Sequence, residues 1–234
     1  MLVAACVLAA LSVLMLVAGP LGARLGVWPF LVGFALMAGA IVDALAAIIV
    51  GITAGMRTHR WGVALAAIGA AAAAIAIPLS IVMPAFGSPP IHDITTDPDD
   101  PPLFQTLLRL RSASDSPGSY DGADAATQQR RAYADIQPVI FRASPSRVFD
   151  AALELARERG WQIVDADRDA GRIEAIDSTF WFGFKDDVVI RLRPENTGAR
   201  LDMRSKSRVG VGDLGANARR IRLFVSALTE RLPS

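Results

Sequence analysis

Residues 186–206 read DDVVIRLRPENTGARLDMRSK, and their alternation predicts an antiparallel hairpin. With a turn at 195–198, apolar residues oppose one another on one face and opposite charges do so on the other. The pairs are Leu192 with Leu201, Ile190 with Met203 and Val188 with Ser205, then Arg191 with Asp202 and Asp187 with Lys206. We expect the apolar face to be buried and the charged pairs to be exposed, contributing about 0–1 kcal/mol each.

Further elements flank this hairpin. A strand is expected over 136–142, and Ser144 with Pro145 opens a helix that ends at Gly160. Strands follow over 161–167 and 171–178, and a last helix starts near Asp213. The order predicts an α+β domain, with an antiparallel sheet of four to five strands and helices on one face.

The N-terminal part is apolar. All but three of the 24 basic residues, and all but one of the 23 acidic residues, lie after residue 87. Three stretches, about 2–19, 28–55 and 61–83, are long enough to span a bilayer, and Pro20 and Gly22 separate the first two. No basic residue precedes the first stretch, so we expect a retained helix rather than a signal peptide.

The distribution of arginines predicts the orientation. Arg57 and Arg60 outweigh Arg24, which places their loop in the cytoplasm and the C-terminal domain on the extracytoplasmic side. The expected location is therefore the inner (cytoplasmic) membrane, as a multi-pass protein.

Two features of the spans suggest packing contacts. Gly51 and Gly55 form a small-residue pair, typical of close helix packing and able to support a homo-oligomer. Asp43 lies mid-span, where a carboxyl is costly. We favour a role in helix packing, against Ser12 or Ser80, over a proton or ligand site.

The composition divides the chain into three parts and excludes several classes. Residues 1–86 form the transmembrane block, 87–134 an extended tether and loop, and 135–234 the α+β domain. The domain carries no net positive field, which argues against nucleic-acid binding. Cys6 is the one cysteine, so no intrachain disulfide can form.

Few residues suggest catalysis. His92, Asp93 and Asp97 form the candidate acid/base group, with an ordered tether as the alternative. With His59 across the membrane, no two-histidine zinc site is available, and we expect neither metal nor cofactor. The glycines of 210–215 match a dinucleotide loop, but too little chain follows for that fold, so Asp213 is interpreted as a helix cap.

The aromatic run 180–184 reads FWFGF. It is either a core plug at the end of the sheet or an exposed lip for a lipid-like ligand or the bilayer surface. The residues predicted to bind a ligand are Trp181, Phe182, Lys185, Arg208 and Asn217.

These motifs resemble a bacterial family labelled domain of unknown function 1499. The matching stretches are 91–97 with 100–102, 181–191, and 205–208 through Gly210 with 213–215 and Asn217. The resemblance implies an envelope-associated domain without an assigned reaction. The helix followed by Gly160-Trp161 and 171–175 is also similar to the outer-membrane assembly lipoprotein C type, which supports a helix-on-sheet fold.

Three functions remain open. The first is a membrane-anchored binding or scaffolding module of the cell envelope, whose partners are the bilayer and an envelope lipid or protein. The second is an enzyme acting on an envelope lipid or glycan, with His92 and Asp93 or Asp97 as the acid/base pair. The third is transport through the membrane block by way of Asp43.

Overall fold

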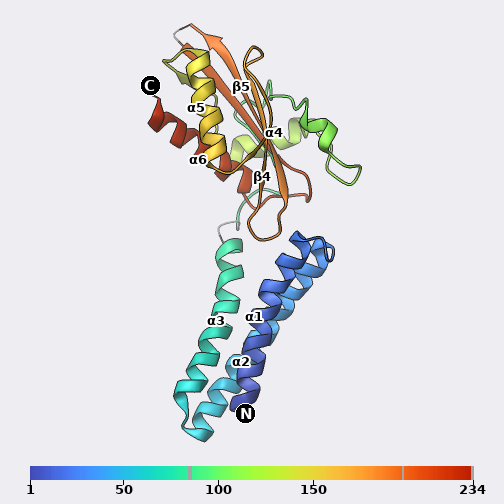
Figure 1. The fold of residues 1–234 in the computed structure, drawn as a ribbon, viewed down its shortest axis with the longest axis vertical. Coiled ribbons are helices and arrows are strands. Elements are labelled where there is room, and N and C mark those ends of the chain that lie inside the picture. Colours follow the sequence, from blue (N-terminus) through green and yellow to red (C-terminus); the bar gives the residue numbers. More distant parts are fainter. Residues whose placement is uncertain (84–85, 197, 233–234) are drawn as a thin grey trace. The chain divides into compact units, whose positions relative to one another are not determined.

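A computed structural model describes residues 1–83, 86–196 and 198–232 (Figure 1). The chain forms two compact units. One contains Met1–Phe86 with Phe180–Gly183, and the other contains Gly87–Thr179 with Phe184–Ser234. Separate clusters of buried apolar residues stabilise the helices of the first unit and the sheet of the second.

The first unit holds α1 (Leu2–Arg24), α2 (Phe30–Thr58) and α3 (Trp61–Val82). All three are long and apolar enough to cross a membrane. Contrary to expectation, α1 continues through Pro20, because membrane helices tolerate proline where neighbouring groups satisfy the freed backbone. α2 continues to Thr58 and ends at His59, whose left-handed backbone (φ 55°) terminates it.

Glycines set the spacing of these helices. A Cβ on Gly19 would lie 2.7 Å from the carbonyl oxygen of Gly33 in α2. A Cβ on Gly51 would lie 2.8 Å from Cγ1 of Ile68 in α3. The small residues of α2 therefore allow close packing within one chain.

The second unit is built on a six-stranded antiparallel sheet with the order β1-β6-β5-β4-β3, in which β2 also pairs with β6. Its strands are β1 (Asp93–Thr95), β2 (Val139–Phe141), β3 (Gln162–Asp167), β4 (Arg172–Ser178), β5 (Lys185–Glu195) and β6 (Gly198–Ser207). The helices are α4 (Gly122–Ala132), α5 (Pro145–Glu158) and α6 (Ala216–Arg231). The predicted α+β class is confirmed.

The stretch expected as a tether is part of this fold. Residues 87–134 include β1, a 3-10 turn (Leu107–Leu110) and α4, so the expectation of an extended tether and loop is wrong. β1 was missed because it is short and carries Asp93. The neighbouring strand supplies the cation that makes this buried carboxylate stable, since Asp93 pairs with Lys206.

The predicted register of the β5–β6 hairpin is confirmed at all five pairs. Its apolar face packs under α5 and α6, with Met203, Leu201 and Phe224 fully buried. The charged face differs from expectation, because Asp187, Asp202 and Lys206 are also fully buried. Residues of the segment 97–121 lie over this face, and their hydrogen bonds and apolar side chains replace water there.

Candidate functional site

His92 lies just before β1 and is held on both sides of its ring. Its Nδ1 donates to the carbonyl oxygen of Gly210 (2.5 Å), and its Nε2 lies 3.3 Å from Oδ2 of Asp121. The hydrogen bond with Asp121 raises the pKa of His92 above its ordinary 6.5, against burial and Lys206, which lower it. The imidazole ring therefore links the start of α4 to the β6–α6 loop.

The same contacts lower the pKa of Asp121. Burial alone would raise the pKa of Asp121, but hydrogen bonds from His92 and Lys206 lower it to about 2. Asp121 is therefore ionised wherever His92 titrates.

This pair predicts a pH-dependent stability. Because folding raises the pKa of His92, its stabilisation is complete below pH about 6.5 and is lost as the pH rises through the folded pKa. We expect the Tm of the full chain in detergent to fall as the pH rises above about 6.5, and His92→Gln to flatten that fall. The control, His59→Gln in the exposed α2–α3 connection, should keep the wild-type slope. An unaltered slope in His92→Gln would contradict the assignment.

Asp93 is fully buried and neutralised by two cations. Nε of Arg204 lies 2.8 Å from Oδ1 of Asp93, and Nη2 of Arg204 lies 2.8 Å from Oδ2. Nζ of Lys206 lies 3.3 Å from Oδ2. Arg204 and Lys206 are themselves fully buried. Asp93 is therefore a structural anion.

A second buried anion lies nearby on β5. Asp187 accepts hydrogen bonds from Arg208 at Oδ1 (2.7 and 2.9 Å) and from Arg111 at Oδ2 (2.8 Å). Arg208 also donates to the carbonyl oxygen of Leu110 (3.1 Å). The guanidinium of Arg208, which the sequence predicts to bind a ligand, thus joins β5 to the segment 97–121 that covers the charged face of the sheet.

Asn217, at the start of α6, connects three elements. Its Nδ2 donates to the carbonyl oxygen of His92 (3.0 Å) and to Oγ of Ser207 (2.9 Å), and its Oδ1 accepts from Ser205 (2.6 Å). Its backbone N–H donates to Asp213 (2.6 Å). α6 begins at Ala216 with Gly215 as its N-cap residue, so the expectation that Asp213 is the N-cap is wrong. The carboxylate of Asp213 nevertheless accepts the N–H groups of Gly215 and Asn217. Asn217 is fully buried.

Asp97 belongs to a different cluster. Its carboxylate pairs with Arg200 and accepts the backbone N–H groups of Asp99 (3.2 Å) and Asp100 (3.0 Å). Arg200 lies six positions from Lys206 along β6, which corresponds to about 20 Å. His92 and Asp97 therefore contact opposite parts of β6 and do not form one acid/base pair.

The aromatic run forms the β4–β5 turn. Phe180 is 81% exposed, Trp181 and Phe182 are partly buried, and the rings of Phe180 and Trp181 meet edge to face at 5.7 Å. Lys185 begins β5 with its side chain exposed. None of these side chains is fully buried, which favours an exposed lip over a core plug.

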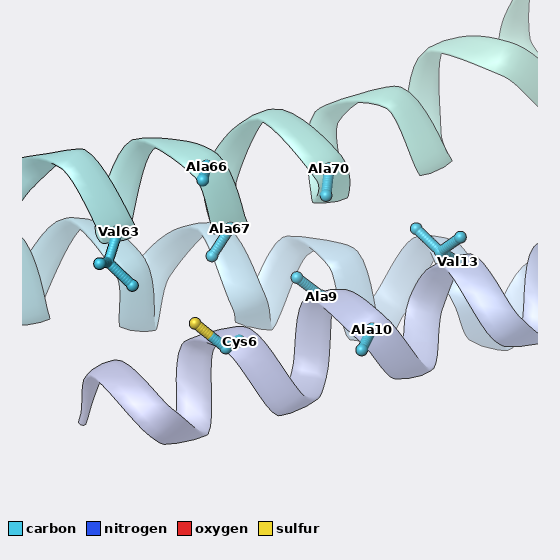
Figure 2. Close-up of a pocket in the computed structure, with 8 residues that line it drawn as sticks. All are labelled: Cys6, Ala9, Ala10, Val13, Val63, Ala66, Ala67 and Ala70. Carbon is cyan, nitrogen blue, oxygen red and sulfur yellow. The ribbon is translucent and has the colours of Figure 1, made fainter.

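Two cavities of the described structure differ in their lining. Figure 2 shows a groove between α1 and α3, of about 420 Å³, whose lining of Cys6, Val13, Val63 and alanines has no charged group. A cleft of about 430 Å³ lies between the 96–99 loop, α4 and residues 136–138. Asp97 lines the cleft, whereas His92, Asp93 and the predicted ligand-binding residues line neither cavity. The structure therefore does not gather the predicted site residues around one cavity.

Asp43 keeps one carboxylate oxygen, Oδ2, buried without a hydrogen-bond partner. Its expected partners are engaged elsewhere. Ser12 donates to the carbonyl oxygen of Ala9 (2.9 Å) and Ser80 to that of Ile77 (2.8 Å). Asp43 lines neither cavity.

Sequence reasoning missed the partners that occupy the polar face. Arg204 and Asp121 were not singled out, although every second residue from Arg200 to Arg208 is charged. Five charges in a row on one strand face were a signal that another segment covers them. Within the part of the chain that the structure describes, no group of three His, Cys, Asp or Glu side chains could hold a metal ion.

Three helices long and apolar enough to cross a membrane, joined to an α+β unit with a buried charged layer, define the class of this protein. A family model described as "Protein of unknown function (DUF1499)" matches residues 93–228, and the chain belongs to this family. The motifs that carried the resemblance include Arg208, Asp213 and Asn217, which lie in the polar network.

The other comparisons add little. The chain is similar to the crystal structure of protein CV1439 from Chromobacterium violaceum, at 15% identity and a TM-score of 0.31. The match covers 42% of this chain and 95% of that one. No curated protein matches the chain.

Proposed function

We propose that the protein is a membrane-anchored binding or scaffolding module of the cell envelope, with its α+β unit on the extracytoplasmic side of the inner membrane. The observation that carries this proposal is the internal pairing of the polar candidates. His92, Asp93 and Arg208 are all buried and bonded to other residues of the chain. Such pairing builds a rigid support rather than a reactive centre.

The alternative, an enzyme acting on an envelope lipid or glycan, needs His92 with Asp93 or Asp97. The geometry does not favour it, because Asp93 is neutralised by Arg204 and Lys206 and Asp97 by Arg200. His92 itself pairs with Asp121. An anchor that holds a preformed surface accounts for the same contacts without a reaction.

Cysteine labelling tests the orientation. In a Cys6→Ser background, Asn196→Cys marks the exposed β5–β6 turn and His59→Cys the exposed α2–α3 connection. We expect a membrane-impermeant maleimide to label Asn196→Cys in intact spheroplasts, and His59→Cys only after permeabilisation. The reverse pattern would overturn the extracytoplasmic placement, and equal labelling of both in detergent is the control for reactivity.

Native mass spectrometry of the full chain, released in discs of its own membrane, tests the binding role. We expect one defined additional mass that survives dilution, from a lipid, glycan or protein. A bare chain in repeated preparations would count against a binding module.

A further inference from the structure

One end of the sheet gathers the segment that follows α3 and two loops. Ser178 of β4 pairs with Lys185 of β5, so the β4–β5 turn leaves from this end. Asp186 pairs with Ser207, the last residue of β6, so the β6–α6 loop leaves from the same end. Because Asp93 pairs with Lys206, the chain also enters the sheet here.

The covalent chain keeps this end close to the third span. α3 ends at Val82, and Oγ of Ser88 lies 3.1 Å from where a Cβ of Gly215 would stand. Six residues reach at most about 21 Å when fully extended. The covalent chain therefore sets an upper limit on how far Ser88, and the β6–α6 loop beside it, can lie from the end of α3.

The β6–α6 loop exposes two large apolar side chains at this end. Val211 is 81% exposed and Leu214 is 57% exposed. Large apolar side chains held exposed in one loop cost hydration free energy that an apolar partner would recover. We call Val211 and Leu214 the membrane-proximal apolar group.

The backbone of the β6–α6 loop is held in a costly conformation. Leu214 has φ +55°, a left-handed conformation that non-glycine residues rarely adopt. The surrounding contacts enforce it. Asp213 accepts the N–H groups of Gly215 and Asn217, and His92 holds the carbonyl oxygen of Gly210. The network thus fixes a strained loop that presents an exposed leucine.

Basic residues flank the apolar group. Lys185 begins β5 and Arg219 lies in the first turn of α6, both with exposed side chains at this end of the unit. Apolar side chains bordered by cations are typical of surfaces that enter the interfacial region of anionic membranes.

We infer that the membrane-proximal apolar group is a bilayer-contact surface, with Val211 and Leu214 inserted among phospholipid headgroups and upper acyl chains. The inference rests on the membrane anchor in the proposed function, but not on the side of the membrane. The short linker favours the bilayer over a protein partner, because it holds the loop within about 21 Å of the end of α3. The buried charged layer of the α+β unit then acts as the rigid support of this surface.

Site-directed fluorescence in lipid nanodiscs tests the inference with the full chain. In a Cys6→Ser background, Val211→Cys and Leu214→Cys each receive an environment-sensitive dye. The control is Ile140→Cys, a 54% exposed site on β2, which pairs near the β5–β6 turn at the other end of the sheet. Discs contain phosphatidylcholine with or without phosphatidylglycerol, and a matched set contains lipid with a nitroxide high on the acyl chain.

We expect the nitroxide lipid to lower the fluorescence at 211 and 214 at least about twofold, more strongly with phosphatidylglycerol, and to leave position 140 unchanged. Fluorescence at 211 and 214 that is as insensitive as at 140 would overturn the inference. Thermal unfolding of each labelled variant verifies its fold, and the two loop positions serve as independent probes. Discs expose both leaflets, so failure here is distinguishable from failure of the extracytoplasmic placement.

Discussion

Replacing Asp93 with Asn is expected to lower the free energy of unfolding of the α+β unit by about 3–5 kcal/mol. The amide keeps the shape of the carboxyl but removes its charge, which leaves Arg204 and Lys206 fully buried with less compensation. Small domains are stable by only about 5–15 kcal/mol, so a loss of this size removes a large share of the stability. Urea unfolding of the full chain in detergent, followed by tryptophan fluorescence, measures the change.

The matched control is Asp135→Asn. Asp135 also pairs with an arginine, Arg222, but its side chain is 57% exposed. Water screens that pair, so we expect a change of no more than about 1 kcal/mol. Equal effects of the two substitutions would show that burial of an ion pair does not change its contribution to the free energy of unfolding.

Replacing Arg208 with Gln gives the second large effect. Asp187 would keep Arg111 but lose the hydrogen bonds that Arg208 makes at 2.7 and 2.9 Å. The covering segment would also lose its bond at the carbonyl of Leu110. We expect the free energy of unfolding to fall by about 3 kcal/mol, at the lower end for a broken buried pair.

This variant separates two roles for Arg208. A surface residue that only binds a ligand would leave the stability of the free protein almost unchanged. Arg219→Gln, on the exposed side of α6, is the matched control and should change the free energy of unfolding by less than about 1 kcal/mol. A stable Arg208→Gln variant would restore the ligand-binding interpretation.

The local pattern was enough to predict the hairpin. Each of the five residue pairs from Val188 with Ser205 to Asp187 with Lys206 follows from period-two alternation and the position of the turn. The first turn of α5 also follows from local chemistry, since Ser144 accepts the N–H of Arg147 and Pro145 starts the helix. These features depend on neighbours in the sequence.

The packing of the segment 97–121 over the charged face could not be predicted in the same way. Glu174 accepts the N–H groups of Gln105 and Leu107, which lie almost seventy residues earlier in the chain. Asp93 meets Arg204 across more than a hundred residues. Nothing in the alternation of β6 distinguishes a charge that meets water from one that meets a distant segment.

The partners of the candidate acid/base residues could not be predicted for a related reason. His92 and Asp93 are adjacent in the sequence, but β1 directs them to different partners, Asp121 and Arg204. Residue type alone indicates that a histidine beside a carboxylate could transfer a proton. The contacts show instead that each side chain pairs with a residue distant in the sequence.

The position of β6 also determines when the domain can fold. β1 and β2 pair only with β6, which is the last strand of the chain to be synthesised. A ribosome that has completed β5 has therefore made a sheet without its central strand, and Asp93 without its cations. β1 and β2 therefore lack their partner until β6 has been made, whereas β3, β4 and β5 can already pair with one another. Over that interval their unpaired backbone groups are open to pairing with other chains.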